Sequence, residues 1–131
     1  MILIVDDQPD IARALAMLLE DSGYSAEVAE SGREALDKLR HTTPQAVILD
    51  MMMPDIDGSA VLRAMRSDPD MQNIPVVVFS ADASQQRIEQ TIRLGAQDYI
   101  IKGASGWDDL RNRIERVLAD PSHEPAPTTR H

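Results

Sequence analysis

The sequence predicts an α/β fold in which a five-stranded parallel sheet carries helices on both faces, a doubly wound (βα)5 arrangement. Three observations indicate this fold. Short apolar runs rich in Val and Ile recur along the chain, as in buried parallel strands. Amphipathic helical patterns alternate with these runs. Polar or charged residues directly follow four of the runs, at the end of the sheet where such folds bind ligands.

The first two βα units differ in how polar their strands are. We expect a buried strand over residues 1–5 and a helix that starts near Pro9, because proline is favoured in a first helical turn. Residues 24–29 alternate weakly, as a half-exposed edge strand would. The next helix follows Ser31, whose spacing to Glu34 is that of a capping box.

The other three units repeat the same order of strand and helix. Each has an apolar run and then apolar residues at helical spacing. The expected strands cover residues 46–49, 74–79 and 98–101. The expected helices cover residues 58–66 and 84–94, and a last helix ends near residue 119.

A strand order can also be proposed. With right-handed crossovers, the small doubly wound order 2-1-3-4-5 of flavodoxin-like folds is the natural closure for five βα units. Strands 2 and 5 then form the edges. Ser25 and Glu27 make strand 2 the more polar of the two, as suits an edge.

Length and composition exclude several classes of protein. The 131 residues suffice for one domain, and the net charge of −9 argues against autonomous nucleic-acid binding while favouring metals or cationic partners. There is no cysteine and no apolar run of about 18 residues, so disulfides and a membrane span are not expected. No signal peptide is evident, and we expect a cytoplasmic protein.

The chain divides into a folded part and a terminal segment. Residues 1–119 hold all the strand and helix patterns. Residues 120–131 contain three prolines and no apolar stripe, which predicts a mobile tail or a linker.

Five side chains should meet at the carboxyl ends of the strands. Asp6 and Asp7 follow strand 1, Asp50 follows strand 3, Ser80 ends strand 4 and Lys102 follows strand 5. Neighbouring carboxylates repel one another, so the cluster needs cations at neutral pH. Hard oxygen ligands suit Mg²⁺, and the lysine supplies a further positive charge. The set therefore suits a divalent cation and a phosphoryl group.

The residues at this rim resemble the receiver domain of two-component response regulators, in the stand-alone form typified by chemotaxis regulators. The resemblance covers residues 1–119. It rests on the ordered occurrence, each at a strand end, of Asp6-Asp7, LDMMMPDIDG over residues 49–58, Ser80-Ala81 and Lys102.

This resemblance implies a phosphoacceptor that uses Mg²⁺. Asp50 would take a phosphoryl group from a sensor histidine kinase or a histidine phosphotransfer protein. Asp7, Asp50 and the main-chain carbonyl of Met52 would coordinate Mg²⁺ directly, with Asp6 acting through water. Lys102 would neutralise charge on the transferring group. Such a domain is a regulator rather than an enzyme, since it promotes only its own phosphorylation and dephosphorylation.

The resemblance also implies how the signal leaves the site. The Ser80 hydroxyl would bind the phosphoryl group, and Tyr99 would turn inward into the space that Ser80 vacates. The surface of helix 4, strand 5 and helix 5 would then change for an unknown downstream protein. Met52 and Asp82, each two residues after a site residue, would tune the lifetime of the phosphoryl group.

Helix 5 leaves two interpretations open. Arg111, Arg113 and Arg116 could form a docking face for a partner or for a second copy on phosphorylation. They could instead belong to a solvated helix face balanced by neighbouring acidic residues.

The site residues also have purely structural interpretations. Asp6 or Asp7 could cap the first helix, and Asp50 could merely begin a turn. Ser80 could satisfy a loop, Lys102 could be solvated and Tyr99 could be half-buried packing.

One departure from the family concerns the residue after Lys102. Receivers usually have proline there, often with a cis bond, whereas this chain has Gly103. We therefore expect a trans peptide bond and a longer, looser loop over residues 103–106. Trp107 is expected to pack at the start of helix 5.

Two further functions compete with a stand-alone regulator. The chain could be the receiver part of a longer regulator whose output domain is missing. It could also be a Mg²⁺-dependent phosphohydrolase that forms an aspartyl phosphate. Such hydrolases usually need an Asp-x-Asp motif after strand 1, where this chain has Asp6-Asp7-Gln8.

Overall fold

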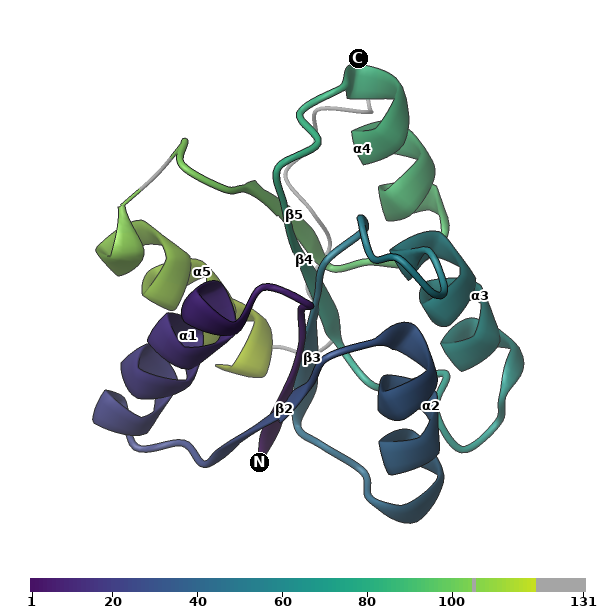
Figure 1. The fold of residues 1–131 in the computed structure, drawn as a ribbon, viewed down its shortest axis with the longest axis horizontal. Helices are drawn as coiled ribbons and strands as arrows, with labels where there is room; N and C mark the ends of the chain where they lie inside the picture. The colour runs from purple at the N-terminus through teal and green to yellow at the C-terminus, as the bar shows by residue number, and fades with distance from the viewer. Residues whose placement is uncertain (105, 120–131) are drawn as a thin grey trace.

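The computed structural model describes residues 1–104 and 106–119. Strands and helices alternate along this part of the chain (Figure 1). The strands are β1 (Ile2–Val5), β2 (Ala26–Ala29), β3 (Ala46–Leu49), β4 (Val76–Ser80) and β5 (Asp98–Ile101). The helices are α1 (Pro9–Asp21), α2 (Gly32–His41), α3 (Gly58–Ser67), α4 (Gln85–Arg93) and α5 (Trp107–Ala119).

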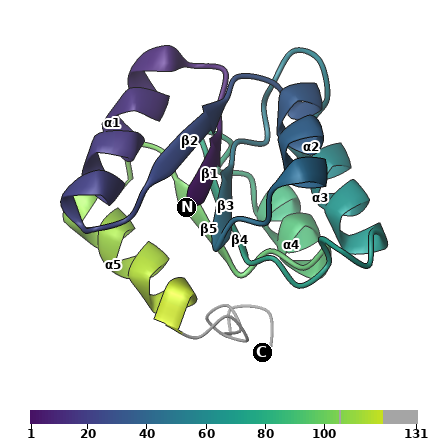
Figure 2. The same cartoon turned by 90° about the horizontal axis from the view of Figure 1, so that it is seen from below.

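The strands form one parallel sheet in the order β2-β1-β3-β4-β5, which confirms the predicted topology. Helices α1 and α5 cover one face, and α2, α3 and α4 cover the other (Figure 2). The expected tail, residues 120–131, lies outside the described residues. No helix within the described residues combines the length and apolar character that a bilayer span requires.

The core lies on both faces of the sheet because side chains of a strand alternate between its faces. In β1, Leu3 and Val5 pack toward α2 and α3, whereas Ile2 and Ile4 pack toward α1 and α5. All four side chains are buried, so the near-continuous apolar run reports a strand covered on both sides.

Two strands begin two residues later than the sequence patterns predict. The Tyr24 N–H donates to the Leu19 carbonyl at 3.0 Å and closes the end of α1, so β2 begins only at Ala26. Pro75 has no N–H to donate to the sheet, and β4 begins at Val76 rather than at residue 74.

Candidate functional site

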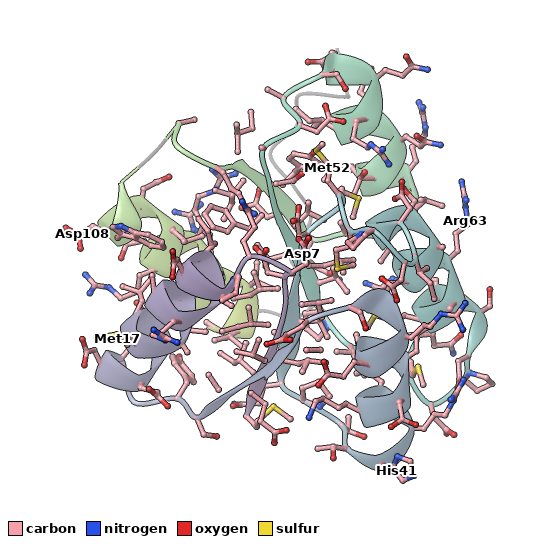
Figure 3. All side chains as sticks on the ribbon, viewed as in Figure 1. Asp7, Met17, His41, Met52, Arg63 and Asp108 are labelled. Carbon is pink, nitrogen blue, oxygen red and sulfur yellow. The ribbon has the colours of Figure 1, made fainter. Side chains whose placement is uncertain are left out.

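Three of the five predicted rim residues, Asp7, Asp50 and Lys102, line a pocket of about 220 Å³ at the carboxyl ends of the strands. The pocket is lined by Asp7, Gln8, Asp50, Met52, Ala81 and Lys102. Asp7 and Met52, which line this pocket together, lie toward the middle of the view in Figure 3, whereas Met17 and His41 lie at its periphery.

The pairing of β1 with β3 brings the carboxylates together. Val5 and Leu49 are partners in the ladder, and the Asp50 N–H continues it by donating to the Val5 carbonyl at 2.9 Å. Oxygen atoms of Asp6, Asp7 and Asp50 consequently lie within 4.8 Å of one another. Asp6 and Asp50 are 2% and 4% exposed, while Asp7 is open to solvent.

Lys102 is held by several groups despite the missing proline. Its ammonium lies 2.9 Å from Asp6 and 3.4 Å from Asp50, and it donates to the Gln8 Oε1 at 2.7 Å. It also lies 5.7 Å from the centre of the Phe79 ring, within cation–π range. These four contacts restrain the position of the ammonium group.

Gly103 provides the turn after this lysine. Its φ of +82° lies in the left-handed region that favours glycine, and the Lys102–Gly103 peptide bond is trans, as predicted. The expectation of a longer, looser loop remains a prediction, because residue 105 lies outside the described residues.

Burial makes the charge of Asp50 costly. Desolvation raises the pKa of the Asp50 carboxyl, and the positive charge of Lys102 and the Met52 N–H only partly oppose this rise. Three carboxylates against one ammonium leave the pocket short of positive charge. Oxygen donors that are already close together and carry excess negative charge fit a hard divalent cation such as Mg²⁺.

Neither Asp6 nor Asp7 caps α1, so that structural interpretation is wrong. The N-cap residue is Gln8, and no side chain bonds to the first turn at this cap. The Asp6 Oδ1 instead accepts the Gln8 N–H at 2.9 Å, which fixes the turn that leads from β1 into the helix.

Ser80 and Tyr99 meet at the main chain of Asp82. The Asp82 N–H donates to the Ser80 Oγ at 3.3 Å, and the Tyr99 hydroxyl donates to the Asp82 carbonyl at 2.6 Å. Ser80 is fully buried, and Tyr99 is only 7% exposed. Burial raises the pKa of the Tyr99 hydroxyl. Tyr99 therefore already faces inward, rather than lying half-buried.

The structure separates the two residues expected to tune the phosphoryl lifetime. Met52 is 57% exposed and lines the Asp50 pocket. Asp82 lines a different pocket, between α3 and α4, where its carboxylate accepts bonds from the Ser84 N–H at 3.0 Å and the Arg87 Nε at 3.3 Å.

Three residues that support the site were not identified from the sequence. Gln8 contacts Lys102, and its place directly after the Asp pair was a usable signal. Asp55 accepts the N–H groups of Gly32 and Arg33 at 3.1 and 3.0 Å and so joins the loop after Asp50 to α2. A Cβ at Gly58 would lie 2.4 Å from the Asp50 carbonyl oxygen, so α3 starts directly against the main chain of Asp50.

The arginines of α5 are not equivalent. Arg113 donates to both carboxylate oxygens of Asp98 in β5, at 2.9 and 2.6 Å. Among residues 1–104 and 106–119, Arg111 pairs only with Asp108, at 3.0 Å on the surface. Trp107 packs one side against Phe79, with ring centres 6.3 Å apart, yet remains 46% exposed. Arg113 is thus a structural residue, while Arg111 remains available on the surface.

Comparisons with known proteins agree with this geometry. The family model described as the response regulator receiver domain matches residues 2–115. The response regulator MprA of Mycolicibacterium vanbaalenii is 42% identical over 117 residues, which are 89% of this chain and 49% of that protein. A 14.6 kDa protein of Leptolyngbya boryana, named as uncharacterized, is 32% identical over 120 residues, 92% of each chain.

Solved structures show the same fold. A CheY-like response regulator receiver domain protein from Methanospirillum hungatei JF-1 has a TM-score of 0.84 at 26% identity, covering 92% of this chain and 94% of that one. The chain spans about half the length, or less, of the first curated relatives that it matches. With a family match over nearly all of the folded part, the chain belongs to the response regulator receiver domain family.

Proposed function

We propose that the chain is a phosphoacceptor in which Asp50 receives a phosphoryl group from a sensor histidine kinase or a histidine phosphotransfer protein. The observation that carries this proposal is the surroundings of Asp50. Its buried carboxylate opens onto a pocket, with Lys102 at 3.4 Å and two further carboxylates beside it. A solvated or turn-forming aspartate would need none of these neighbours.

The transfer itself requires little covalent chemistry from the protein. A carboxylate oxygen of Asp50 attacks phosphorus, and the bond to the donor imidazole nitrogen breaks, leaving the electron pair on that nitrogen. Lys102 neutralises part of the charge on the transferring group. Asp7, Asp50 and the Met52 main-chain carbonyl would hold Mg²⁺, with Asp6 acting through water. When bound, this ion supplies the remaining positive charge.

The signal would pass through Ser80 and Tyr99. The Ser80 hydroxyl would donate to a phosphoryl oxygen, and inward-facing Tyr99 would accompany that state. The surface of α4, β5 and α5 would then engage a downstream protein. The domain acts as a regulator and turns over no foreign substrate.

Mass spectrometry after incubation with acetyl phosphate and Mg²⁺ tests the acceptor. We expect one labile phosphoryl adduct in the natural chain and none in Asp50→Asn. Asp37→Asn is the matched control, because Asp37 is exposed on α2 and does not line the Asp50 pocket. It should keep the adduct. An unchanged adduct in Asp50→Asn would refute the proposal.

The same phosphoacceptor could also serve within a longer regulator. The match to about half of MprA favours this second candidate, while the match to 92% of the 14.6 kDa Leptolyngbya protein favours a stand-alone domain. The native mass of the protein in its own cells separates the two. A mass near 14.5 kDa supports the stand-alone form, and a larger single chain supports the longer regulator.

A further inference from the structure

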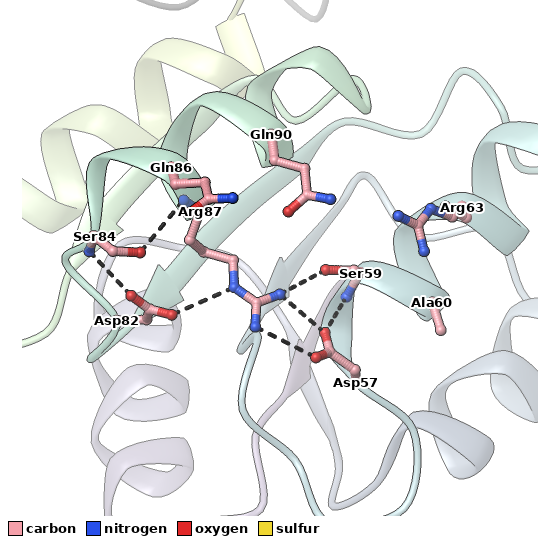
Figure 4. Close-up of a pocket in the computed structure, with 9 residues that line it drawn as sticks. All are labelled: Asp57, Ser59, Ala60, Arg63, Asp82, Ser84, Gln86, Arg87 and Gln90. Carbon is pink, nitrogen blue, oxygen red and sulfur yellow. Dashed lines mark hydrogen bonds and ion pairs between the residues drawn. The ribbon is translucent and has the colours of Figure 1, made fainter.

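A pocket of about 430 Å³ lies between the starts of α3 and α4, beside the Asp50 site but distinct from it. Arg87 occupies its centre, with its guanidinium group between two carboxylates (Figure 4). The Nε donates to Asp82 at 3.3 Å, and the two terminal nitrogens reach Asp57 at 3.3 and 3.4 Å. One terminal nitrogen also donates to the Ser59 hydroxyl at 2.8 Å.

The two carboxylates belong to the loops on either side of the acceptor. Asp57 closes the loop that follows Asp50 and caps α3 by accepting the Ser59 N–H at 2.7 Å. Asp82 belongs to the loop that follows Ser80. Arg87, on α4, therefore joins these two loops and the helix at one point. Its side chain is only 25% exposed, so the link is partly shielded from solvent.

Asp82 is fixed through all of its polar groups. Its carboxylate binds Arg87 and the Ser84 N–H, its own N–H donates to Ser80, and its carbonyl accepts the Tyr99 hydroxyl at 2.6 Å. That carbonyl accepts the buried Tyr99 hydroxyl, and the Ser80 side chain is a second hydrogen-bonding group close to the same hydroxyl. An unpaired buried hydroxyl is costly, so whatever holds Asp82 in place also favours the inward position of Tyr99.

We propose that Arg87 is a positioning residue that holds Asp82 where its carbonyl receives Tyr99, and thereby favours the phosphorylated state. This proposal rests on the proposed function, in which inward Tyr99 accompanies phosphorylation. A partly exposed ion pair shifts a two-state equilibrium about two- to fivefold. Loss of Arg87 should therefore weaken binding of a phosphoryl analogue by about that factor.

The test titrates beryllofluoride in Mg²⁺ and follows the emission of the single tryptophan, Trp107. Arg87→Gln should bind about two- to fivefold more weakly than the natural chain. Arg63→Gln is the matched control, because Arg63 lines the same pocket but is exposed and has no bond to Asp82 among the described residues. It should bind normally. Unchanged or tighter binding in Arg87→Gln overturns the proposal.

A double variant separates positioning from simple attraction of an anion by a positive charge. If Arg87 acts through Asp82, then Arg87→Gln should have no further effect in an Asp82→Asn background. The same loss in both backgrounds would show that the charge alone matters and would overturn the proposal. Should Arg87→Gln not fold, Arg87→Lys keeps the charge without the planar fork and should show the same direction of change. If Arg87→Lys binds beryllofluoride as tightly as the natural chain, the proposal that Arg87 positions Asp82 is refuted.

Fluorine NMR of 3-fluorotyrosine protein gives a reading that does not depend on phosphoryl chemistry. The chain has two tyrosines, and Tyr24 serves as the internal reference. The Tyr99 signal should move toward its solvent-exposed position in Arg87→Gln and stay in place in Arg63→Gln. An unchanged Tyr99 signal in Arg87→Gln would overturn the proposed link between Arg87 and the position of Tyr99. Failure of the natural chain to bind beryllofluoride would instead count against the proposed function.

Discussion

The Lys102 ammonium lies 2.9 Å from Asp6, closer than its 3.4 Å separation from Asp50. The lysine thus shares its charge between a carboxylate of the predicted cation site and the predicted acceptor. A cation held by Asp7 and Asp50, with Asp6 acting through a bound water, would compete with the lysine for the charge of Asp6. The ammonium would then be released toward Asp50, where the transferring group is to be neutralised.

Asp7→Ala should abolish Mg²⁺ binding, because Asp7 is the exposed member of the carboxylate cluster and is not paired with Lys102. Asp50→Asn should only weaken binding, since the amide oxygen remains a ligand. The measurement is the change in Trp107 emission as Mg²⁺ is added. Asp10→Ala, in the first turn of the neighbouring helix α1, controls for loss of charge alone. Normal Mg²⁺ binding by Asp7→Ala would show that the ligand assignment is wrong.

Asp50→Asn should raise the stability of the protein at neutral pH in the absence of Mg²⁺. Burial raises the pKa of Asp50 in the folded state, so the folded protein holds this proton more tightly than the unfolded chain. The free-energy cost of keeping Asp50 charged in the folded protein is therefore present in full above the pKa of Asp50 in the folded state. This cost disappears as the pH falls to the pKa of 3.8 in the unfolded chain. Urea unfolding at several pH values measures the difference. A gain that persists at the lowest pH would contradict this cause.

Met52→Asn should shorten the lifetime of the phosphorylated protein. Met52 lines the Asp50 pocket and is exposed, yet its side chain offers no good hydrogen bond to an attacking water. An amide at this position could orient that water, and one neutral hydrogen bond corresponds to about a two- to tenfold faster decay. Loss of labelled phosphoprotein in Mg²⁺ gives the rate. Unchanged or slower decay would mean that Met52 does not limit water attack.

Gly103→Ala should slow phosphorylation by acetyl phosphate and reduce stability by about 1–2 kcal/mol, because alanine disfavours positive φ. Gly23→Ala provides a matched control. Gly23 also has a positive φ, and a Cβ at either glycine would meet no atom within 4 Å. Both variants should lose similar stability in urea, but only Gly103→Ala should alter phosphorylation. Equal phosphorylation in the two variants would show that the turn does not position Lys102.

Dimerisation on phosphorylation, if α5 is a docking face, should be lost in Arg111→Glu. Arg111 makes only a surface pair, so its replacement should leave the fold intact. Arg113→Ala, by contrast, breaks a two-bond pair with Asp98 and should cost about 1–2 kcal/mol of stability. Light scattering with and without beryllofluoride measures the mass. Equal monomeric masses with and without beryllofluoride would rule out dimerisation on phosphorylation.

The sheet could be predicted because each strand is marked by an apolar pattern within a short stretch of the sequence. Apolar runs such as residues 46–49 report strands that are buried on both faces, and right-handed crossovers leave one natural strand order. The carboxylate cluster followed from the same reasoning, since Asp6 and Asp50 end neighbouring strands. The first residues of the strands were harder to predict. Tyr24 has high β propensity, but its N–H bonds to the end of α1, so the strand starts later than the pattern indicates.

The supporting contacts could not be predicted because they join distant parts of the chain. Arg87 meets Asp57 across 30 residues and Asp55 meets Gly32 across 23, and neither spacing follows a helical or strand period. The contacts of the α5 arginines could not be predicted from the sequence for the same reason. Arg111 and Arg113 look alike in the sequence, yet only Arg113 lies opposite Asp98.

The loop between Asp50 and α3 is attached to the rest of the domain at several points. Asp55 holds the start of α2, and Asp57 is bound by Arg87. The Gly58 N–H donates to the Met51 carbonyl at 3.0 Å and closes the loop on itself. Inserting or deleting a single residue here would displace all of these attachments at once. The segment can therefore exchange side chains at unattached positions such as Met52, but it cannot change in length.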